Sequence, residues 1–368
     1  MGFQSVVSMK ILHITNSFSE GGVESLLLDT LPRMVQKGHQ VELLALNKNN
    51  ASLKDQLEHK GVKVRLGSYS RIYNPLNIFV ISRILRRHKY DIVHANLFPT
   101  QYYVIAARWM VRDSRTRFVT TEHGTSNNRR KYPFFKYLDR FFLRQYDSVI
   151  AISVAVRNVL KEWTRTESTV IYNGIDLSRF SKPRKDRITR ADVHIPEQAT
   201  ILIMVARFSN QKDHQTLIQA IVDLPNTFII FIGTGDNLES CQKRAKYLGL
   251  EDRIRFVGYT PTPERYMSIA DIGVLSTYYE GFGISVVEYM IMGLPTIVSD
   301  VPGMKEVMGD AVIRVIPQSV PEMRQAIENL ITDKELYNSM SQKAIERAKL
   351  FDIQKTVSDY IQLYQNLL

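Results

Sequence analysis

The amino-acid sequence predicts an α/β fold of two Rossmann-like domains that face each other across a cleft. Short aliphatic and β-branched runs alternate with segments of helical periodicity, which is typical of a doubly wound parallel sheet. The same alternation starts again in the second half of the chain. The length of 368 residues also favours two domains, because a single core rarely grows beyond about 250–300 residues.

In the first half, a helix is predicted at Glu24–Lys37, where apolar residues recur at helical spacing before Gly38. The predicted strands are Lys10–Ile14, Gln40–Leu46, Lys63–Leu66, Ile92–Ala95, Phe118–Thr121, Ser148–Ile152 and Thr169–Tyr172. Because Met9-Lys10-Ile11-Leu12 has the pattern of a first strand, we interpret Met1–Ser8 as an extension.

In the second half, the predicted strands are Thr200–Ala206, Thr227–Ile232, Arg253–Val257, Ile272–Ser276, Pro295–Ser299 and Ala311–Val315. The predicted helices are His214–Val222, Asn237–Leu248, Pro263–Ala270, Gly283–Met292 and Val320–Thr332. Between the halves, Asp176–Pro196 is polar and basic with two prolines, which predicts a linker. We therefore expect a first domain at residues 1–178, rejoined by a C-terminal helix at 353–368, and a second domain at 179–352.

The composition is that of an ordinary folded protein, with 44% hydrophobic and 23% charged residues. The single cysteine, Cys241, excludes an internal disulfide and a thiol-rich metal site, and it fits a reducing cytosol. No signal-peptide pattern is present, and no apolar run reaches the roughly 18 residues of a transmembrane helix. We expect a cytoplasmic protein.

The net charge of +11 is unevenly distributed. Residues 1–178 contain 26 Lys and Arg against 14 Asp and Glu, whereas residues 179–368 contain 22 against 23. This asymmetry predicts an anionic surface or partner for the first half. A solvated basic face without a partner is the alternative, and no nucleic-acid-binding module is recognisable, so no nucleic acid is expected.

The strongest local basic feature is the segment Arg129–Arg144. Its cations Lys136, Arg140 and Arg144 recur every four residues, and Phe134, Leu138 and Phe141 form another stripe. A basic, aromatic amphipathic helix can lie in a membrane interface, where each cation contributes about 1 kcal/mol near anionic lipid. This favours peripheral attachment to the inner face of the membrane. The alternative is a helix that buries its aromatic residues and solvates its cations.

The segment Glu280–Pro295 carries the strongest indication of a binding site. It reads Glu-Gly-Phe-Gly-Ile-Ser-Val-Val-Glu-Tyr-Met-Ile-Met-Gly-Leu-Pro and follows a predicted strand, so its glycines open a helix. Such a turn exposes backbone N–H groups and the positive end of the helix dipole, which bind anions. Glu280 precedes the helix, where a carboxylate can accept hydrogen bonds from sugar hydroxyls. Glu288 lies within it, where its two oxygens can accept both hydroxyls of a ribose.

Two cations, Arg207 and Lys212, follow the first predicted strand of the second half. A guanidinium fork and an ammonium group together suit two adjacent phosphates. The sequence contains no Asp-x-Asp motif for gripping a metal ion. We therefore expect no metal and no cofactor. For each of these residues taken singly, a solvated charge or a simple turn is the alternative interpretation.

These motifs resemble those of the retaining glycosyltransferases of family 4, which have the GT-B fold. The resemblance runs from about residue 9 to about residue 300 and follows the order and spacing of the family. Besides Glu280–Pro295 and the pair Arg207 and Lys212, it rests on Gly21-Gly22-Val23-Glu24, Asp91-Ile92-Val93-His94-Ala95, Thr121-Glu122-His123-Gly124, Ile152-Ser153 and Asn173-Gly174-Ile175-Asp176.

The resemblance implies metal-independent transfer of a sugar from a nucleotide diphosphate sugar, and it favours a UDP-sugar as the donor. The acceptor would be a saccharide or a lipid-linked saccharide, in capsule or exopolysaccharide assembly. It also implies front-side attack, in which the leaving phosphate takes the acceptor proton. His123 would then position and stabilise rather than act as a base, while His94 would be a structural hydrogen-bonding residue.

The implied catalytic residues are His123, Arg207, Lys212 and Glu280. The implied donor contacts are Gly21, Gly22, Arg207, Lys212, Gly233, Gly258, Tyr259, Glu280, Gly281, Phe282, Gly283, Ile284 and Glu288. Gly233-Thr234-Gly235 lacks the third glycine of a dinucleotide-binding motif. Two other functions stay open: a sugar-nucleotide epimerase, which needs no acceptor, and a non-catalytic sugar-nucleotide-binding protein.

Overall fold

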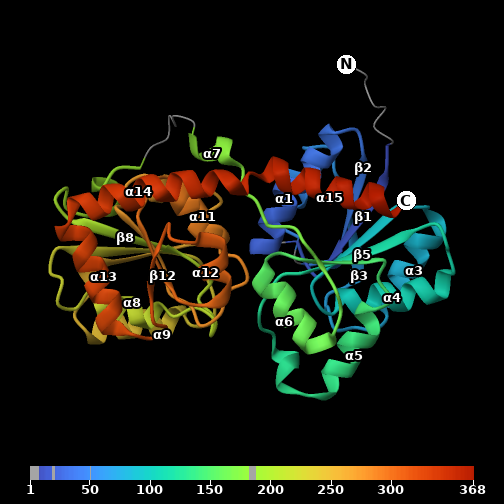
Figure 1. Cartoon of the computed structure of the whole chain (residues 1–368), viewed down its shortest axis with the longest axis horizontal. Coiled ribbons are helices and arrows are strands. Elements are labelled where there is room, and N and C mark those ends of the chain that lie inside the picture. Colours follow the sequence, from blue (N-terminus) through green and yellow to red (C-terminus); the bar gives the residue numbers. More distant parts are fainter. Residues whose placement is uncertain (1–7, 19–20, 50, 182–187) are drawn as a thin grey trace. The chain divides into compact units, whose positions relative to one another are not determined.

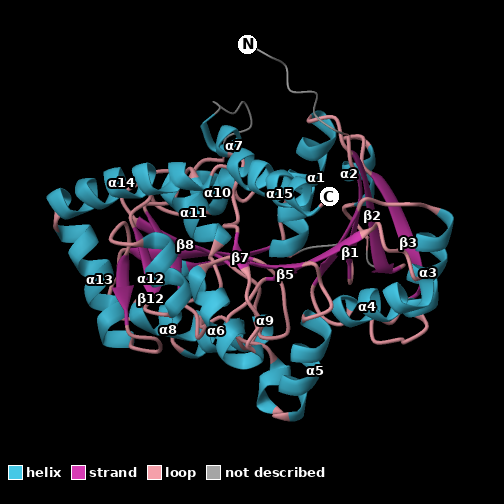
Figure 2. Ribbon diagram, turned by 45° about the vertical axis from the view of Figure 1, so that its right-hand side comes forward, coloured by secondary structure: helices cyan, strands magenta, loops and turns pink. Residues whose placement is uncertain are grey.

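A computed structural model of the protein describes residues 8–18, 21–49, 51–181 and 188–368. The chain divides into two compact units, Met1–Gly174 with Ile353–Leu368 and Ile175–Asp352. Each unit is a parallel sheet covered by helices, so the predicted α/β fold of two Rossmann-like domains is confirmed (Figures 1 and 2). Except for Ser8, the extension predicted at Met1–Ser8 lies outside the described residues.

The described part of the first unit contains a seven-stranded parallel sheet in the order β3-β2-β1-β4-β5-β6-β7. Its strands are β1 (Lys10–Thr15), β2 (Gln40–Asn47), β3 (Lys63–Tyr69), β4 (Ile92–Asn96), β5 (Arg117–Glu122), β6 (Ser148–Ala151) and β7 (Thr169–Val170). Every strand predicted for this half is present. The largest differences are at the ends of β3, which is longer than predicted, and β7, which is shorter.

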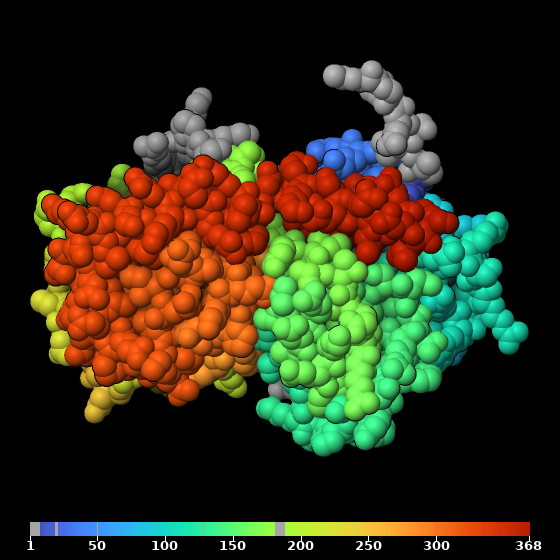
Figure 3. Space-filling view, viewed as in Figure 1, coloured from blue at the N-terminus to red at the C-terminus, as the bar shows by residue number. Residues whose placement is uncertain are grey.

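Helices cover both faces of this sheet. They are α1 (Gly22–Gln36), α2 (Lys54–Glu58), α3 (Asn77–Arg87), α4 (Thr100–Val111), α5 (Phe134–Leu143), α6 (Val154–Thr164) and α15 (Ile353–Leu367). One apolar core joins α1, α2 and α15 to the sheet, and a second core joins α3, α4, α5 and α6 to it. In the space-filling view, the red atoms of α15 lie on this unit (Figure 3).

The last helix is held to the first unit by a buried polar chain as well as by apolar contacts. The Nδ1 atom of His94 lies 2.6 Å from the Tyr364 hydroxyl, and its Nε2 atom lies 2.7 Å from the Thr121 hydroxyl. His94 is almost fully buried, and burial holds the pKa of its imidazole well below the ordinary value. His94 therefore has the structural surroundings expected from its position at the end of β4.

The described part of the second unit contains a six-stranded parallel sheet in the order β10-β9-β8-β11-β12-β13. Its strands are β8 (Thr200–Val205), β9 (Thr227–Ile232), β10 (Ile254–Gly258), β11 (Ile272–Leu275), β12 (Thr296–Ser299) and β13 (Ile313–Val315). Its helices are α7 (Leu177–Ser181), α8 (His214–Ala220), α9 (Leu238–Tyr247), α10 (Glu264–Met267), α11 (Ile284–Ile291), α12 (Pro302–Met308), α13 (Val320–Thr332) and α14 (Lys334–Ala348).

The prediction of a linker at Asp176–Pro196 is wrong for the residues that the structure describes. Ile195 is buried in the core of the second unit, and Phe180 packs against the same core. Arg190 forms an ion pair with Asp271 at 2.9 Å. The described part of the segment therefore belongs to the second unit, because Phe180 and Ile195 reach that core while Arg179 and Arg190 are paired with acidic residues of the same unit. Residues 182–187 lie outside the described chain.

Candidate active site

In each sheet the strand order reverses next to the first strand: between β1 and β4 in the first unit, and between β8 and β11 in the second. At such a point the loops that follow two neighbouring strands leave toward opposite faces and open a crevice at the carboxyl edge of the sheet. Ligands of open α/β sheets bind in that crevice. The sequence-predicted site residues of the second unit follow β8, β9, β10 and β11, so all of them belong to this edge.

The loop after β8 is joined to the loop after β11. An isolated bridge pairs Lys212 with Thr277. The backbone N–H of Tyr278 donates to the Gln211 carbonyl at 3.0 Å, and the Gln211 side-chain amide donates to the Tyr279 carbonyl at 2.8 Å. These contacts bring Lys212 next to Glu280, although the two residues are far apart in the sequence.

Lys212 and Glu280 form a partly buried ion pair. Their side chains are 13% and 16% exposed, and the Lys212 ammonium donates to Oε2 of Glu280. The other carboxylate oxygen accepts from the Gly281 N–H at 3.0 Å. Burial by itself raises the pKa of Glu280, but the charge and hydrogen bond of Lys212, together with the backbone N–H groups of Gly281 and Phe282, outweigh it and hold that pKa below its usual range. The two predicted ligand-binding groups therefore satisfy each other.

The helix that follows Glu280 begins as the sequence predicts. Gly283 is its N-cap with a φ of 83°, and no side chain caps it. The positive φ favours glycine here, and a Cβ atom at Gly283 would also displace the Met304 methyl group, which lies 2.5 Å from that position. The first turn, which starts at Ile284, therefore presents backbone N–H groups. Glu288 lies further along α11 and is half-buried.

The turn after β9 lies on the backbone that follows β8. Gly233 and Gly235 have φ angles of 141° and 145°. A Cβ atom at Gly233 would lie 2.1 Å from the Ala206 carbonyl oxygen, and a Cβ atom at Gly235 would lie 2.3 Å from the Phe208 carbonyl oxygen. This close approach places the turn beside Arg207, whose side chain is exposed at the end of β8. The glycines therefore shape the wall next to Arg207.

The end of β10 joins the same edge. The Gly233 N–H donates to the Gly258 carbonyl at 2.9 Å, and Gly258 has a φ of 81°. Tyr259 follows it and is 42% exposed. Thus Arg207, Lys212, Gly233, Gly258, Tyr259, Gly281 to Ile284 and both glutamates are all carried by one edge of the second unit.

The remaining predicted residues lie in the first unit. Gly21 is the N-cap of α1 and Gly22 is its first residue; a Cβ atom at Gly21 would lie 2.3 Å from Oε2 of Glu24. His123 follows β5, with its Nε2 atom 3.3 Å from Oδ1 of Asn96. Burial lowers the pKa of His123 to about 4, so its imidazole is neutral near pH 7.

Sequence reasoning missed Asn96, the partner of His123. It also missed the contact between Gly273 and Tyr289. A Cβ atom at Gly273 would lie 2.6 Å from the Tyr289 ring, and the Tyr289 hydroxyl accepts from the Val205 N–H at 2.5 Å. This contact sets the depth of α11 against the sheet. The position of Asn96 two residues after His94 on β4 could have suggested the first contact, whereas no local pattern indicates the second.

The first unit also carries an exposed aromatic surface, which we call the aromatic face. It consists of Trp109, Tyr132, Phe134, Tyr137 and Phe141. Phe134 and Tyr137, both residues of α5, are 67% and 69% exposed. The label α5 marks this helix at the lower end of its unit in Figure 1. Trp109 of α4 and Phe141 of α5 are in contact, with ring centroids 5.7 Å apart. Residues 71–144 contain 15 Lys and Arg against 4 Asp and Glu, so this segment accounts for the whole net charge of the chain.

The basic run Arg129–Arg144 does not lie on this surface as a whole. Arg129 forms an ion pair with Asp139 at 3.0 Å, and its guanidinium lies 4.1 Å from the Phe98 ring centroid. Arg130 donates to the Thr125 carbonyl. The other cations of the run reach solvent: Lys131 and Arg144 are exposed, and Lys136 and Arg140 are half-exposed.

Within the described residues, no group of three or more His, Cys, Asp and Glu side chains is arranged to hold a metal ion. The same part of the chain has no helix that is both long and apolar enough to cross a membrane.

Two family models match the chain. The model for Glycosyltransferase Family 4 matches residues 20–179, and the model for Glycosyl transferases group 1 matches residues 185–347. The chain is 28% identical over 321 residues to the N-acetyl-alpha-D-glucosaminyl L-malate synthase of Bacillus anthracis, which covers 83% of this chain and 84% of that protein. It is 26% identical over 367 residues to the lipopolysaccharide core biosynthesis glycosyltransferase LpsD of Rhizobium meliloti, covering 97% and 98% of the two chains.

Among solved structures, Anabaena Alr3699/HepE in complex with UDP and glucose superposes with a TM-score of 0.86 at 21% identity, over 97% of this chain and 99% of that one. The fold is therefore the GT-B fold of glycosyltransferases. The two family models together match most of the chain, and the protein belongs to glycosyltransferase family 4.

Proposed function

We propose that the protein is a retaining, metal-independent glycosyltransferase that takes its sugar from a UDP-sugar. The observation that carries the proposal is the pairing of Lys212 with Glu280 at the strand-order reversal of the second unit, beside Arg207 and the open first turn of α11. This edge offers two cations and backbone N–H groups for a diphosphate, and carboxylates for the hydroxyls of a sugar and a ribose.

The identity of the donor is supported by related structures. Anabaena HepE was solved with UDP and glucose and also with UDP-glucose, and both structures share the fold of this chain. In the proposed site, Glu288 binds the ribose, Tyr259 lies at the nucleobase, and Arg207 and Lys212 bind the diphosphate.

The proposed chemistry needs no protein base. The bond from the sugar C1 to the phosphate oxygen breaks, and the acceptor oxygen bonds to C1 from the same face. The acceptor proton passes to the leaving phosphate, whose charge Arg207, Lys212 and the α11 N-terminus stabilise. A neutral His123 then serves as a positioning group in the first unit. Because the sequence lacks an Asp-x-Asp motif, we expect activity to survive excess EDTA; loss restored by Mn²⁺ or Mg²⁺ would contradict this.

The relatives also support a cell-surface polysaccharide as the product. Two of them are named for lipopolysaccharide core and O-antigen biosynthesis. We propose a saccharide or lipid-linked saccharide acceptor, handled by a cytoplasmic enzyme. The aromatic face and the positive charge of residues 71–144 suit attachment to the inner, anionic face of a membrane, because aromatic rings and cations both favour that interface.

Calorimetry with UDP and NMR of UDP-glucose turnover test the donor site. Lys212→Ala should weaken UDP binding roughly tenfold or more, since it removes a charge-assisted hydrogen bond. Lys243→Ala, an exposed site on α9 of the same unit, should not change it. The first glucose released or transferred should be the α anomer. Equal UDP affinity in Lys212→Ala and the parent would refute the proposed site. Deuterium uptake at C2 of the sugar without transfer would favour an epimerase.

Vesicle co-sedimentation tests the membrane contact. Changing Lys136, Arg140 and Arg144 to Glu should release the protein from anionic vesicles while UDP affinity stays unchanged. The matched control changes Lys246, Lys334 and Lys343 of the second unit, all exposed, to Glu and should stay bound. Added salt should weaken the binding of the parent protein, because exposed charges are screened over about 8 Å at physiological ionic strength. If the parent protein does not bind anionic vesicles even at low salt, the proposed membrane attachment is excluded.

A further inference from the structure

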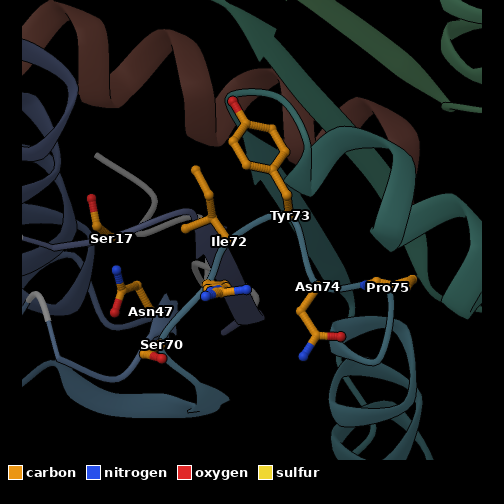
Figure 4. Close-up of a pocket in the computed structure, with 8 residues that line it drawn as sticks. Ser17, Asn47, Ser70, Ile72, Tyr73, Asn74 and Pro75 are labelled. Atoms are coloured by element: carbon orange, nitrogen blue, oxygen red, sulfur yellow. The ribbon is translucent and has the colours of Figure 1, made fainter.

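The first unit has a pocket of its own at the carboxyl ends of β1, β2 and β3. Its volume is about 650 Å³, within the range of small-molecule sites. The lining residues are Ser17, Asn47, Ser70, Arg71, Ile72, Tyr73, Asn74 and Pro75. Figure 4 shows Ser17, Asn47 and Ser70 on one side and Asn74 and Pro75 on the other.

The loop at residues 70–75, which forms most of this pocket, is held in place by a buried side chain. Asn77 is fully buried, and its side-chain amide donates to the carbonyls of Arg71 and Ile72 at 3.4 and 3.3 Å. The Asn47 N–H donates to the Asn16 carbonyl at 2.8 Å, which joins the ends of β1 and β2. The pocket therefore has a preformed wall rather than a collapsed loop.

Two amide side chains of the pocket have their oxygen atoms engaged by backbone N–H groups. Oδ1 of Asn47 accepts from the Asn49 N–H, and Oδ1 of Asn74 accepts from the Leu76 N–H, each at 3.0 Å. Both side chains are thereby left with their NH₂ groups for a ligand. Within the described part of the chain, Arg71 adds a guanidinium that forms no ion pair, and none of the described lining residues is acidic. Such a set of donors favours a ligand with a negative charge.

The same pocket offers an aromatic ring. Tyr73 is 67% exposed, and its ring lies 6.2 Å from that of Phe98, which braces it from one side. An exposed ring gives an apolar surface to the C–H face of a pyranose, while the surrounding amides and hydroxyls bind its oxygens.

We infer that this pocket is the acceptor subsite and that it takes a sugar ring with an anionic substituent, a carboxylate or a phosphate. The inference rests on the proposed function, since only a transferase needs an acceptor. Arg71 and the amide groups of Asn47 and Asn74 hold the anion, and Tyr73 packs against the ring. The specificity of the enzyme for a charged acceptor then depends on Arg71.

Three probes separate the possibilities in NMR or calorimetric titrations of the full chain: methyl α-D-glucuronide, glucose 6-phosphate and the neutral methyl α-D-glucoside. At least one anionic probe should bind about tenfold more tightly than the neutral one, because a charge-assisted hydrogen bond is added. The anionic probe that binds more tightly identifies the substituent of the acceptor as a carboxylate or a phosphate. Arg71→Gln should abolish the preference, and Tyr73→Ala should weaken all three probes. Arg83→Gln, an equal charge change at an exposed site on α3, should leave the preference intact.

UDP affinity, measured on the same samples, distinguishes the two proposals. If UDP binds but the anionic probes bind no better than the glucoside, or if Arg71→Gln keeps the preference, the acceptor subsite is wrong and the transferase proposal stands. If UDP does not bind to any sample, the proposed function itself fails.

Discussion

Replacing Glu280 by Gln should strengthen the binding of UDP while it weakens sugar transfer. The Lys212 ammonium donates a hydrogen bond to the Glu280 carboxylate, and both side chains are largely buried. To bind a diphosphate, Lys212 must exchange one charge-assisted hydrogen bond for another, so the net gain is small. With Gln at position 280, this competing carboxylate is absent and so is its repulsion of the phosphates.

The size of the effect follows from this exchange. A hydrogen bond to a charged group contributes about 1.5–3 kcal/mol, and the lower value corresponds to roughly a tenfold change in Kd. UDP should therefore bind about tenfold more tightly to Glu280→Gln. Turnover of UDP-glucose should fall by about ten- to a hundredfold, because the carboxylate no longer accepts hydrogen bonds from the sugar.

Calorimetry with UDP and an initial-rate assay measure the two changes. Glu239→Gln provides the control, since Glu239 pairs with Lys243 on the exposed face of α9 in the same unit. A double-mutant cycle with Lys212→Met should remove the gain, because the gain depends on the freed ammonium group. Unchanged or weaker UDP binding in Glu280→Gln would refute the reasoning.

Three further predictions follow from the same geometry. Glu288→Ala should weaken UDP binding about tenfold through the ribose without the gain expected for Glu280→Gln, so equal calorimetric profiles of the two variants would contradict the division of roles. Gly233→Ala should lower the free energy of unfolding by roughly 2–3 kcal/mol in urea titrations, because its Cβ would meet the Ala206 carbonyl, whereas Gly249→Ala, with φ of 66° and open space, should cost only about 1 kcal/mol. Burial lowers the pKa of His13 to about 3, so its contribution to stability is complete above pH 6.5 and is lost as the pH falls toward 3. Urea unfolding can be followed by the fluorescence of the two tryptophans, both in the first unit. Between pH 7 and pH 5, the free energy of unfolding should fall by about 2 kcal/mol less in His13→Leu than in the parent. His59→Leu, at an exposed site, should behave like the parent.

The sheets could be predicted from the sequence because strands buried on both faces read as unbroken apolar runs. Ile201 and Ile230, for example, lie in such runs and are fully buried. The ends of the strands were less certain, since β3 continues through Gly67-Ser68-Tyr69, which has no apolar pattern. The segment Asp176–Pro196 was misread for the opposite reason: its charges and prolines suggested a linker, while Phe180 and Ile195 are too widely spaced to form a pattern.

Long-range contacts limited how much of the candidate site could be predicted from the sequence. The Gly-Phe-Gly turn and its two glutamates could be recognised because the whole motif is contiguous. The contact of Lys212 with Glu280 depends on the pairing of two loops, and no local pattern carries that information. The pocket around Arg71 and Tyr73 is similar, because the ends of three strands supply its walls.

The helix α5 shows what decides between the two interpretations of an amphipathic stripe. Phe134, Leu138 and Phe141 could face the core or the surface, and the buried residues of α5 are Asp139 and Leu143. Asp139 accepts from the Tyr102 hydroxyl at 2.6 Å and from the Trp163 indole at 2.8 Å, and it pairs with Arg129.

This polar anchor fixes the rotation of α5 about its axis, so the aromatic residues on the other side must face outward. Burying a large apolar side chain contributes about 1.5–3 kcal/mol, and Phe134, Tyr137 and Phe141 are each more than half exposed. Because these three rings are largely exposed, the folded chain by itself lacks much of the stabilisation that their burial would contribute. A surface that covers these rings would recover it, and the surplus of positive charge over residues 71–144 makes an anionic lipid interface the surface of matching chemistry.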